Sequence, residues 1–541
     1  MRALNHWRGD LSGGLTAAVV ALPLALAFGV ASGAGPMAGL TGAIMLGFLA
    51  ALFGGTPTQV SGPTGPMTVI MTAVISLLVG RYGQSSGLAM AFTVALMAGG
   101  FQVLFGLMKL GQYITMMPYT VISGFMSGIG AIIVVLQLPP LLGVSLAGPI
   151  PTILARLPWA VAHLNPTALA VGLASFALVM LYPKRWNFLL PAPLVALVVV
   201  SGISVLWLPN GALPRLGPMP TGPPQLQWPQ VGWGDLRTLA GFALTLAVLG
   251  SIDSLLTSLV ADNITPSQHD SDQELIGQGI GNIASALLGG LPGAGATMRT
   301  VTNVQAGGKT RLSGMVHALV LLLFTLGAGS LASPIPHAVL AGILLKVGLE
   351  IIDRSFMVRA PLLSLRTTGL MWLVLLPTVF WDLITAVVVG VFLANILTIK
   401  RHSELQRQAM RSRSGGDHHD LNPEEQALLK QAGDQLLLLQ LSGPLSFGAS
   451  KYLTQLLRSS NNFHTLVLDL SEVPLLGVTA ALAIEAICFD CRDQKRQVYV
   501  VTATDQPRER LHRLKVQTIP EVTLTQSRLT ALAAAINPRV T

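Results

Sequence analysis

The chain has 541 residues, of which 51% are hydrophobic and only 11% are charged. Soluble globular proteins carry roughly 25% charged residues, so this composition excludes a soluble protein, and the mean hydropathy of +0.63 agrees. The formal net charge is +9, but Lys and Arg gather in short loops between apolar runs. Such placement specifies membrane topology, so we expect a lipid bilayer and no nucleic acid as partner.

Apolar segments predict an all-α polytopic membrane domain over residues 1–401, with fourteen transmembrane segments. In chain order they are 12–31, 36–54, 66–80, 87–108, 116–138, 166–182, 187–207, 238–259, 275–290, 297–306, 312–331, 336–351, 367–380 and 382–399. Seven segments in each half make the two halves inverted repeats. The excess of basic residues in alternate loops places both termini in the cytoplasm, with the protein in the plasma (inner) membrane.

Two stretches broken by glycine and proline interrupt the apolar sequence, at 61–68 (SGPTGPMT) and 289–299 (GGLPGAGATMR). A lipid-facing helix does not tolerate such a break, because unpaired backbone groups in hydrocarbon cost several kcal/mol each. The segments that follow, 66–80 and 297–306, are shorter than the ~20 residues of a spanning helix and are predicted half-helices. Paired breaks in the two halves of a chain indicate a transporter binding site.

We expect the two half-helices to meet near mid-membrane with their N-termini facing each other. Free N–H groups and the positive ends of the helix dipoles favour an anion there. The expected anion-binding residues are Thr64, Gly65 and Met67 from the first break, and Ala296, Thr297 and Met298 from the second. The bland alternative is that each break is only a packing kink.

Asp253 is the only charged residue between Thr238 and Ala261. A carboxylate inside a spanning helix usually faces a cavity and serves function. Thr257 follows one turn later on the same face, and carbonyls freed by the second break would complete an oxygen site for a hard monovalent cation. Asp253 has two other possible roles: it carries a proton, or it pairs with Arg299. The sequence allows three roles for Arg299. It supplies a fixed positive charge at the anion site, it pairs with Asp253, or it points into a vestibule.

Beyond the membrane domain, residues 402–432 are polar and charged and predict a solvated linker. Residues 433–541 then alternate strands (436–441, 465–470, 497–502) with helices (446–458, 478–491), which predicts a small α/β domain. Both cysteines, Cys488 and Cys491, fall in this domain. Their C-x-x-C spacing has no second pair, so two ordinary buried thiols are expected rather than a metal or redox site.

Several motifs resemble the sulfate-permease family of anion transporters: 9–23 (GDLSGGLTAAVVALP), 117–125 (MPYTVISGF) and 299–303 (RTVTN). This resemblance implies seven-plus-seven inverted repeats, a core domain that moves against a gate domain, homodimers, and a cytoplasmic STAS domain at 433–541. Within the family, 21–29 (ALPLALAFG), 250–259 (GSIDSLLTSL) and 293–298 (GAGATM) are most similar to cyanobacterial sodium-dependent bicarbonate transporters. That branch implies bicarbonate near Thr64 and Ala296, and sodium at Asp253, Thr257, Gly295 and Thr297.

The sequence departs from the resemblance at a few positions. Arg299 matches the basic residue of the wider family rather than the bicarbonate branch. In the soluble domain, Gly477 and Val478 stand where bacterial relatives have an Asp-Ser pair with a phosphorylated serine, so Thr479 is only a residual candidate for phosphorylation.

The leading hypothesis is a sodium-dependent bicarbonate symporter that works by alternating access, with sodium as coupling ion, no further cofactor and STAS-mediated homodimers. The alternative within the same family is a proton- or sodium-coupled sulfate or dicarboxylate transporter, which Arg299 favours. Two other classes are a passive anion channel or voltage-responsive motor, and an anchored signalling protein. No Ser/His/Asp, H-E-x-x-H or phosphate-loop pattern is present, so no enzyme activity is expected.

Overall fold

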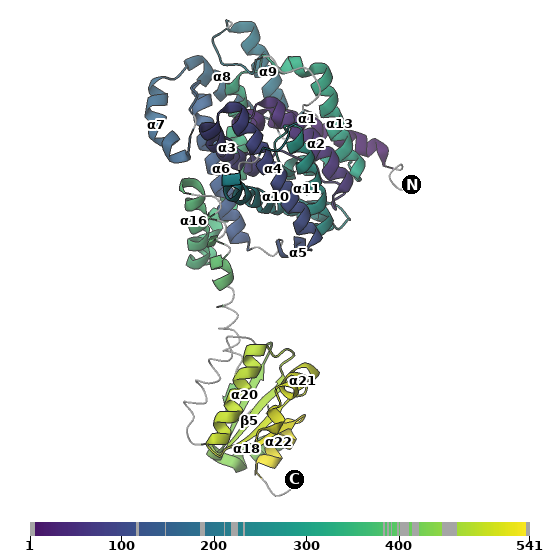
Figure 1. Cartoon of the computed structure of the whole chain (residues 1–541), viewed down its shortest axis with the longest axis vertical. Helices are drawn as coiled ribbons and strands as arrows, with labels where there is room; N and C mark the ends of the chain where they lie inside the picture. The colour runs from purple at the N-terminus through teal and green to yellow at the C-terminus, as the bar shows by residue number, and fades with distance from the viewer. Residues whose placement is uncertain are drawn as a thin grey trace. The chain divides into compact units, whose positions relative to one another are not determined.

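The computed structural model describes residues 6–114, 118–146, 148–183, 190–209, 211–217, 226–230, 233–381, 385–386, 389–390, 392–397, 400, 411–413, 421–445 and 463–536. The chain divides into two compact units, Met1–Val391 and Phe392–Thr541, and each is described by itself. The first is helical and the second is an α/β unit (Figure 1).

The membrane unit consists of helices because the apolar runs can satisfy their backbone groups in hydrocarbon only in that way. The helices of its first half are α1 (Trp7–Ser32), α2 (Pro36–Phe53), α3 (Gly65–Tyr82), α4 (Gln84–Leu107), α5 (Gly111–Ile114), α6 (Tyr119–Leu141), α7 (Ile150–Ala162), α8 (Pro166–Leu181) and α9 (Ala192–Trp207). The second half contains α10 (Leu236–Ile264), α11 (Ser271–Leu287), α12 (Thr297–Gln305), α13 (Arg311–Ala328), α14 (His337–Ile351), α15 (Arg354–Leu363) and α16 (Leu365–Phe380). Short 3₁₀ turns lie at Trp233–Asp235 and Gly329–Ala332.

These helices pack into two bundles. In one bundle α11 packs against α2 and α4, α13 packs against α1 and α2, and α10 packs against α4. In the other, α6 packs against α14 and α16, and α14 packs against α8. The bundles meet mainly where α1 contacts α14 and where α3 contacts α6. Helix α3 therefore belongs to the first bundle and begins at its border with the second.

The predicted apolar segments correspond to helices wherever their residues are described, and within the segment at 382–399 the described residues 385–386, 389–390 and 392–397 are helical. Among the described residues, seven helices are long and apolar enough to span a membrane, and the bent pair α7–α8 would make eight, so the number fourteen stays a prediction. The first predicted half-helix is longer than expected: α3 has 18 residues and passes as a span by length. Helix α12 is short, with nine residues.

Helices α5, α7 and α15 were not predicted. Helix α7 contains Pro158, and α15 contains Pro361 with basic residues at Arg354 and Arg359, so neither forms a long uninterrupted apolar run. Both are amphipathic or short, and a search for membrane-length apolar segments passes over such helices.

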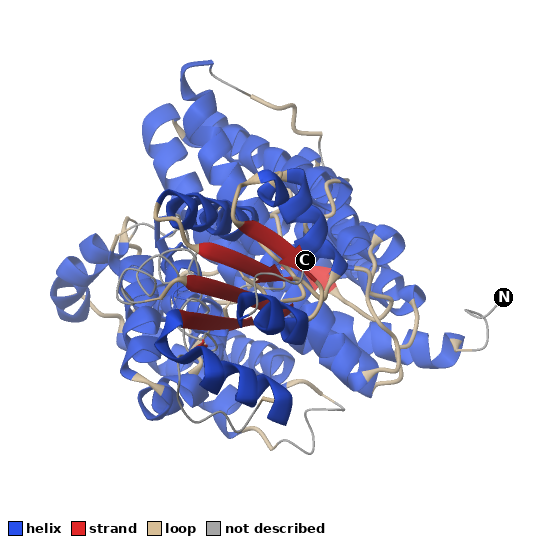
Figure 2. Cartoon of the chain, turned by 90° about the horizontal axis from the view of Figure 1, so that it is seen from below, coloured by secondary structure: helices blue, strands red, loops and turns tan. Residues whose placement is uncertain are grey.

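The second unit is built on one five-stranded sheet, drawn as red arrows between helices in Figure 2. The strands lie in the order β3 (Arg411–Arg413), β4 (Leu436–Ser442), β5 (Thr465–Glu472), β6 (Gln497–Val501) and β7 (Val522–Thr525). Strand β3 is antiparallel to β4, and the other neighbours are parallel. The helices are α18 (Pro423–Ala432), α20 (Val478–Asp493), α21 (Asp505–Arg513) and α22 (Arg528–Ile536), with 3₁₀ turns at Gly433–Gln435 and Val516–Thr518.

Two apolar clusters lie on the two faces of this sheet. One contains Ile484 of α20 and Leu511 of α21, and the other contains Leu429 of α18 and Leu532 of α22. The three predicted strands and the helix predicted at 478–491 are confirmed, whereas the helix predicted at 446–458 lies outside the described residues. The range 402–432 is not all linker, because α18 packs in the second cluster. The charged residues of this range led to the prediction of a linker, but they belong in part to a short helix with a capping box at Asn422 and Glu425.

Both cysteines are buried on α20, as expected. Burial raises the pKa of the Cys488 thiol to about 12 and that of Cys491 to about 11. Thiols with such pKa values stay protonated at pH 8, and the protonated form is a poor nucleophile. In the full-length protein we expect negligible maleimide labelling at pH 8 until urea unfolds this unit. Mass spectrometry of the alkylated protein measures it, and rapid labelling without denaturant would contradict the buried placement.

Arg528 connects two helices and a strand of this unit, because it forms ion pairs with Glu425 at 2.9 Å and Asp469 at 3.0 Å. Both carboxylates are nearly inaccessible to solvent. We expect Arg528→Ala to destabilise the unit by about 3 kcal/mol, because it leaves two buried carboxylates without their cation. The urea midpoint for cysteine labelling measures the change. Arg513→Ala, which removes an exposed pair, is the control and should cost less than about 0.5 kcal/mol.

Candidate functional site

The two broken stretches pair with each other although more than two hundred residues separate them. Strands β1 (Ser61–Gly62) and β2 (Ala294–Gly295) form an antiparallel ribbon with Ser61 opposite Gly295. The N–H of Ala296 extends the ribbon by donating to the carbonyl of Val60 at 2.9 Å. Because the strands run in opposite directions, the helices that follow them, α3 and α12, leave the ribbon in opposite directions. The break ends of both helices therefore lie together.

Glycine is required in this ribbon by close contact. A Cβ at Gly293 would lie 2.1 Å from the carbonyl oxygen of Gly62, and a Cβ at Gly62 would lie 2.4 Å from Nη1 of Arg299. These distances are shorter than any real Cβ contact, so a side chain at Gly293 would separate the two breaks, whereas one at Gly62 would displace the guanidinium of Arg299. The glycines that marked the breaks in the sequence thus allow them to approach each other.

Both helix N-termini at the ribbon lack side-chain caps. The N-cap residues Thr64 and Ala296 have extended backbones, and neither side chain accepts a hydrogen bond from its helix. First-turn N–H groups have no intrahelical acceptor, and the positive end of the helix dipole adds to them. The side chain of Thr64 is also buried, and its hydroxyl interacts with the carboxylate of Asp253. This arrangement suits a small anion.

The six predicted anion-binding residues have different surroundings. Thr64, Gly65 and Ala296 are buried at the ribbon, but Met67 is fully buried with its thioether next to Gly250 of α10. Thr297 is exposed, and 50% of Met298 is exposed. The two methionine side chains therefore do not converge, and a role for these positions rests on their backbone N–H groups. The assignment of all six as ligands stays a prediction.

Three of the four predicted cation ligands come together beside the second break. The hydroxyl of Thr257 donates to the carbonyl of Gly295 at 3.0 Å and lies 2.8 Å from the hydroxyl of Thr297. Asp253, one turn earlier on α10, is buried, and its Oδ2 has no hydrogen-bond partner among the described residues. A carboxylate, a carbonyl and two hydroxyls are the oxygen donors that a hard cation prefers, so the residues fit sodium.

Arg299 connects the second break to the first. Only 2% of this residue is exposed, and its Nη2 donates to the carbonyl of Pro63. Its Nε and Nη1 have no partner among the described residues, and its charge interacts with that of Asp253. A position in an open vestibule is therefore wrong, because Arg299 is buried. Its interior position between the helix N-termini is the one expected of a fixed positive charge at the anion site.

Sequence reasoning gave no reason to single out Glu274 of α11, yet it is buried and accepts hydrogen bonds from the turn before the first break. Acidic residues are common in the first turn of a helix, so the position of Glu274 near the start of α11 gave no sign of a special role. Asp10 is a second buried carboxylate of this kind. It accepts from the N–H groups of Lys309 and Thr310 and fixes the turn after α12 to the start of α1.

Outside the ribbon, a small pocket lies at the border between the two bundles. It is lined by Phe28 of α1, Gly65 and Thr68 of α3, Ile133 of α6 and Leu344 of α14. The N-terminus of α3 therefore lies directly against the second bundle, where relative movement of the bundles would open or close it.

Gly65→Ala tests this contact. A Cβ at Gly65 would lie 2.8 Å from the terminal carbons of Ile133 and Ile351, so both side-chain ends would have to turn away. Overpacking of this kind costs about 1–3 kcal/mol, so we expect at least a roughly fivefold lower maximal anion uptake rate. Flux into proteoliposomes measures it. Gly80→Ala on the same helix is the control, because a Cβ there meets nothing within 4 Å. An unchanged rate for Gly65→Ala would contradict the contact.

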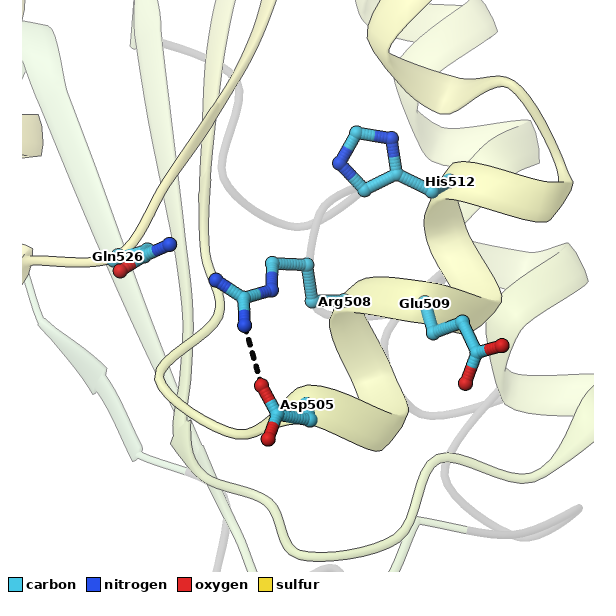
Figure 3. Close-up of a pocket in the computed structure, with 5 residues that line it drawn as sticks. All are labelled: Asp505, Arg508, Glu509, His512 and Gln526. Atoms are coloured by element: carbon cyan, nitrogen blue, oxygen red, sulfur yellow. Dashed lines mark hydrogen bonds and ion pairs between the residues drawn. The ribbon is translucent and has the colours of Figure 1, made fainter.

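The soluble unit has an open polar pocket of its own, drawn in Figure 3. Asp505, Arg508, Glu509 and His512 come from α21, and Gln526 lies across from them. Arg508 is paired with Asp505, and Glu509 points away from it (Figure 3). The pocket combines exposed charges that already have partners, so the ribbon in the membrane unit is the stronger functional site.

Comparisons with known proteins agree with this architecture. The model of the sulfate permease family matches residues 7–376, and that of the STAS domain matches residues 427–528. The bicarbonate transporter BicA of Picosynechococcus sp. is 49% identical over 535 residues, which cover 98% of this chain and 94% of that protein. BicA of Synechocystis sp. is 50% identical, over 98% of this chain and 95% of that protein.

Solved structures give the same result. The transmembrane domain of a cyanobacterium bicarbonate transporter BicA matches with a TM-score of 0.68 and 52% identity, over 71% of this chain and 97% of that chain. SLC26A9 matches with a TM-score of 0.85 over 98% of this chain and 90% of that chain, but at 20% identity it shows the fold alone. These relatives are transporters rather than enzymes. A helical membrane domain with paired broken helices, followed by a small α/β domain, thus places the chain in the sulfate permease family with a C-terminal STAS domain.

Proposed function

We propose that this protein is a secondary active transporter that carries bicarbonate together with sodium. The observation that carries the proposal is the contact of Thr257 with both Gly295 and Thr297, one turn from the buried carboxylate of Asp253 on the same helix. An oxygen site for a cation thus adjoins the N-terminus of α12, which favours an anion. The similarity to bicarbonate transporters of two organisms supports bicarbonate as that anion.

Sodium would couple to the anion through the second break. A bound cation neutralises Asp253 and draws the Gly295 carbonyl and the Thr297 hydroxyl toward itself. These residues lead directly into α12, so the cation orders the helix N-terminus that receives bicarbonate. Thermodynamic linkage then requires bicarbonate to strengthen sodium binding by the same factor. Movement of the bundle that contains α1 and α3 against the bundle that contains α6 and α14 would give alternating access.

Uptake of labelled bicarbonate by purified protein in proteoliposomes tests this function. An inward sodium gradient should accelerate uptake and drive it beyond electrochemical equilibrium. A potassium gradient of the same size, at the same membrane potential, is the control. Uptake indifferent to sodium would sink the symport claim, and uptake that never exceeds equilibrium would indicate a passive anion pathway.

A second candidate is a sulfate or dicarboxylate carrier, which the buried charge of Arg299 favours. A fixed cation between two helix N-termini stabilises a dianion more than a monoanion. In that case sulfate would compete with bicarbonate at low concentration, and an acidic exterior would stimulate uptake if protons replace sodium. Uptake of labelled sulfate in the same vesicles distinguishes the two candidates.

We further propose a homodimer assembled through the STAS domain in the inner membrane, with both termini in the cytoplasm. Exposed apolar residues on α20, namely Val478, Leu482 and Phe489, support a contact surface there. Such a row is unusual on a soluble surface and typical of an interface. Light scattering of the detergent-solubilised protein tests it, and a monomeric mass at micromolar concentration would exclude it.

A further inference from the structure

Glu274 is the centre of a buried hydrogen-bond network. Its Oε2 accepts from the backbone N–H groups of Gly55 and Thr56, at 2.9 and 2.8 Å. Its Oε1 accepts from Nε2 of Gln59 at 2.7 Å and from Nε2 of Gln278 at 2.8 Å. Only 1% of this residue is exposed. All four partners are donors, which is the pattern of an ionised carboxylate with no proton of its own.

Gln59 extends this network to the second break. Because its Nε2 faces Glu274, its Oε1 faces away and accepts from the hydroxyl of Ser258 on α10 at 3.0 Å. Its amide also lies against the backbone of Gly295, where an added Cβ would come within 2.2 Å of Nε2. Gln59 thus occupies the space that a side chain at residue 295 would need.

Gly295 is held from the opposite side by α10. Its N–H donates to the hydroxyl of Ser254 at 3.1 Å, and its carbonyl accepts from Thr257 at 3.0 Å. The position of this carbonyl therefore depends on the α10 hydroxyls on one side and on the Gln59 amide on the other. Glu274 determines which way that amide faces.

We propose that Glu274 and Gln59 are positioning residues for the cation site. Glu274 orients Gln59, and Gln59 in turn fixes the positions of Gly295 and Ser258. Gly295 then lies where its carbonyl and the hydroxyl of Thr257 form the cation site. This inference rests on the proposed sodium coupling and adds residues that touch neither ion. Residues that orient a cation's ligands from behind usually change its affinity by about 10–100-fold when they are replaced.

Glu274→Gln tests the proposal. The new amide has one oxygen and one NH2 group, whereas the carboxylate had two acceptor oxygens. If its NH2 group takes the place of Oε1, it faces the NH2 group of Gln59, so Gln59 turns or loses its partner. We expect the sodium concentration for half-maximal uptake to rise about tenfold or more. The bicarbonate KM and the maximal rate, measured at saturating sodium, should change less than about twofold, because the anion site is otherwise intact.

The reciprocal exchange Gln59→Glu with Glu274→Gln is the sharpest arm. The carboxylate introduced at position 59 then accepts from the new amide and from Ser258, while the oxygen of the amide introduced at position 274 accepts from Gly55 and Thr56. Gln278 has to turn so that its Oε1, which has no partner among the described residues of the wild type, accepts from the new amide instead. Sodium half-saturation should return to within about threefold of wild type, since one carboxylate and one amide again face each other. Asp272→Asn, on the same first turn of α11, is the control and should leave sodium dependence unchanged, because an amide oxygen can accept from Gly111 as well.

Two results would overturn the proposal: unchanged sodium half-saturation in Glu274→Gln, or a lower maximal rate with unchanged sodium half-saturation, which describes a merely structural residue. If Glu274→Gln does not accumulate, Ser258→Ala removes the hydroxyl that donates to Gln59 and also contacts the hydroxyl of Thr56, and the same two results decide. A sodium-dependent shift of the thermal midpoint in detergent gives a readout independent of flux. Wild-type uptake without sodium dependence would instead refute the proposed symport itself.

Discussion

Asp253→Asn is expected to abolish sodium-stimulated bicarbonate uptake. The substitution keeps an oxygen and nearly the same volume but removes the one negative charge among the predicted cation ligands. The remaining donors are the carbonyl of Gly295 and the hydroxyls of Thr257 and Thr297, which are neutral. A buried monovalent cation without a counter-charge is strongly disfavoured, so we expect at least a roughly 100-fold loss of sodium affinity.

Sodium titrations of uptake and of thermal stability measure this effect in the same preparation. Asp262→Asn is the matched control, because Asp262 lies on the same helix but pairs with His269 away from the ribbon. It should retain the wild-type sodium response. An Asp253→Asn variant that keeps full sodium-stimulated flux would refute the role of the carboxylate and favour a cation site elsewhere.

The position of the site could be predicted because its signal is local. Glycine and proline within an apolar run are visible without any knowledge of contacts, and the two helices begin at Gly65 and Thr297, within one residue of the predicted starts. Asp253 and Thr257 were equally visible, because a lone carboxylate in an apolar helix is rare. Their meeting with Gly295 follows from the ribbon that the two breaks form.

The network behind the site could not be predicted in this way. Gln59 and Glu274 are 215 positions apart in the sequence, and each is an ordinary polar residue, one between α2 and α3 and the other in the first turn of α11. Only the packing of α11 against α2 and α4 brings them together. The direction in which the Arg299 side chain points could not be predicted either. Its partner is the backbone carbonyl of Pro63, and a carbonyl gives no signal in a sequence.

Arg299→Met is expected to weaken bicarbonate binding without weakening sodium binding. Arg299 places a positive charge between two uncapped helix N-termini, and its unpartnered Nε and Nη1 are available to an anion. A charge-assisted hydrogen bond contributes about 1.5–3 kcal/mol, so the bicarbonate KM at saturating sodium should rise roughly 10–100-fold. Sodium half-saturation should stay the same or fall, because the charge of Arg299 acts on Asp253 and opposes a cation there.

Asp253→Asn thus changes the cation half of the site and Arg299→Met changes the anion half. Measuring sodium half-saturation and the bicarbonate KM in both variants distinguishes the two roles. Arg299→Lys is the graded control: it keeps the charge but loses the planar donor group that reaches Pro63, so its bicarbonate KM should lie between those of wild type and Arg299→Met. In Arg299→Met, inhibition of uptake by sulfate should weaken more than bicarbonate transport does. A dianion interacts more strongly than a monoanion with the positive charge of Arg299, so it loses more binding energy when that charge is removed. An unchanged bicarbonate KM together with a lost sodium response would contradict this division, and would make Arg299 a structural bridge between the breaks rather than part of the anion site.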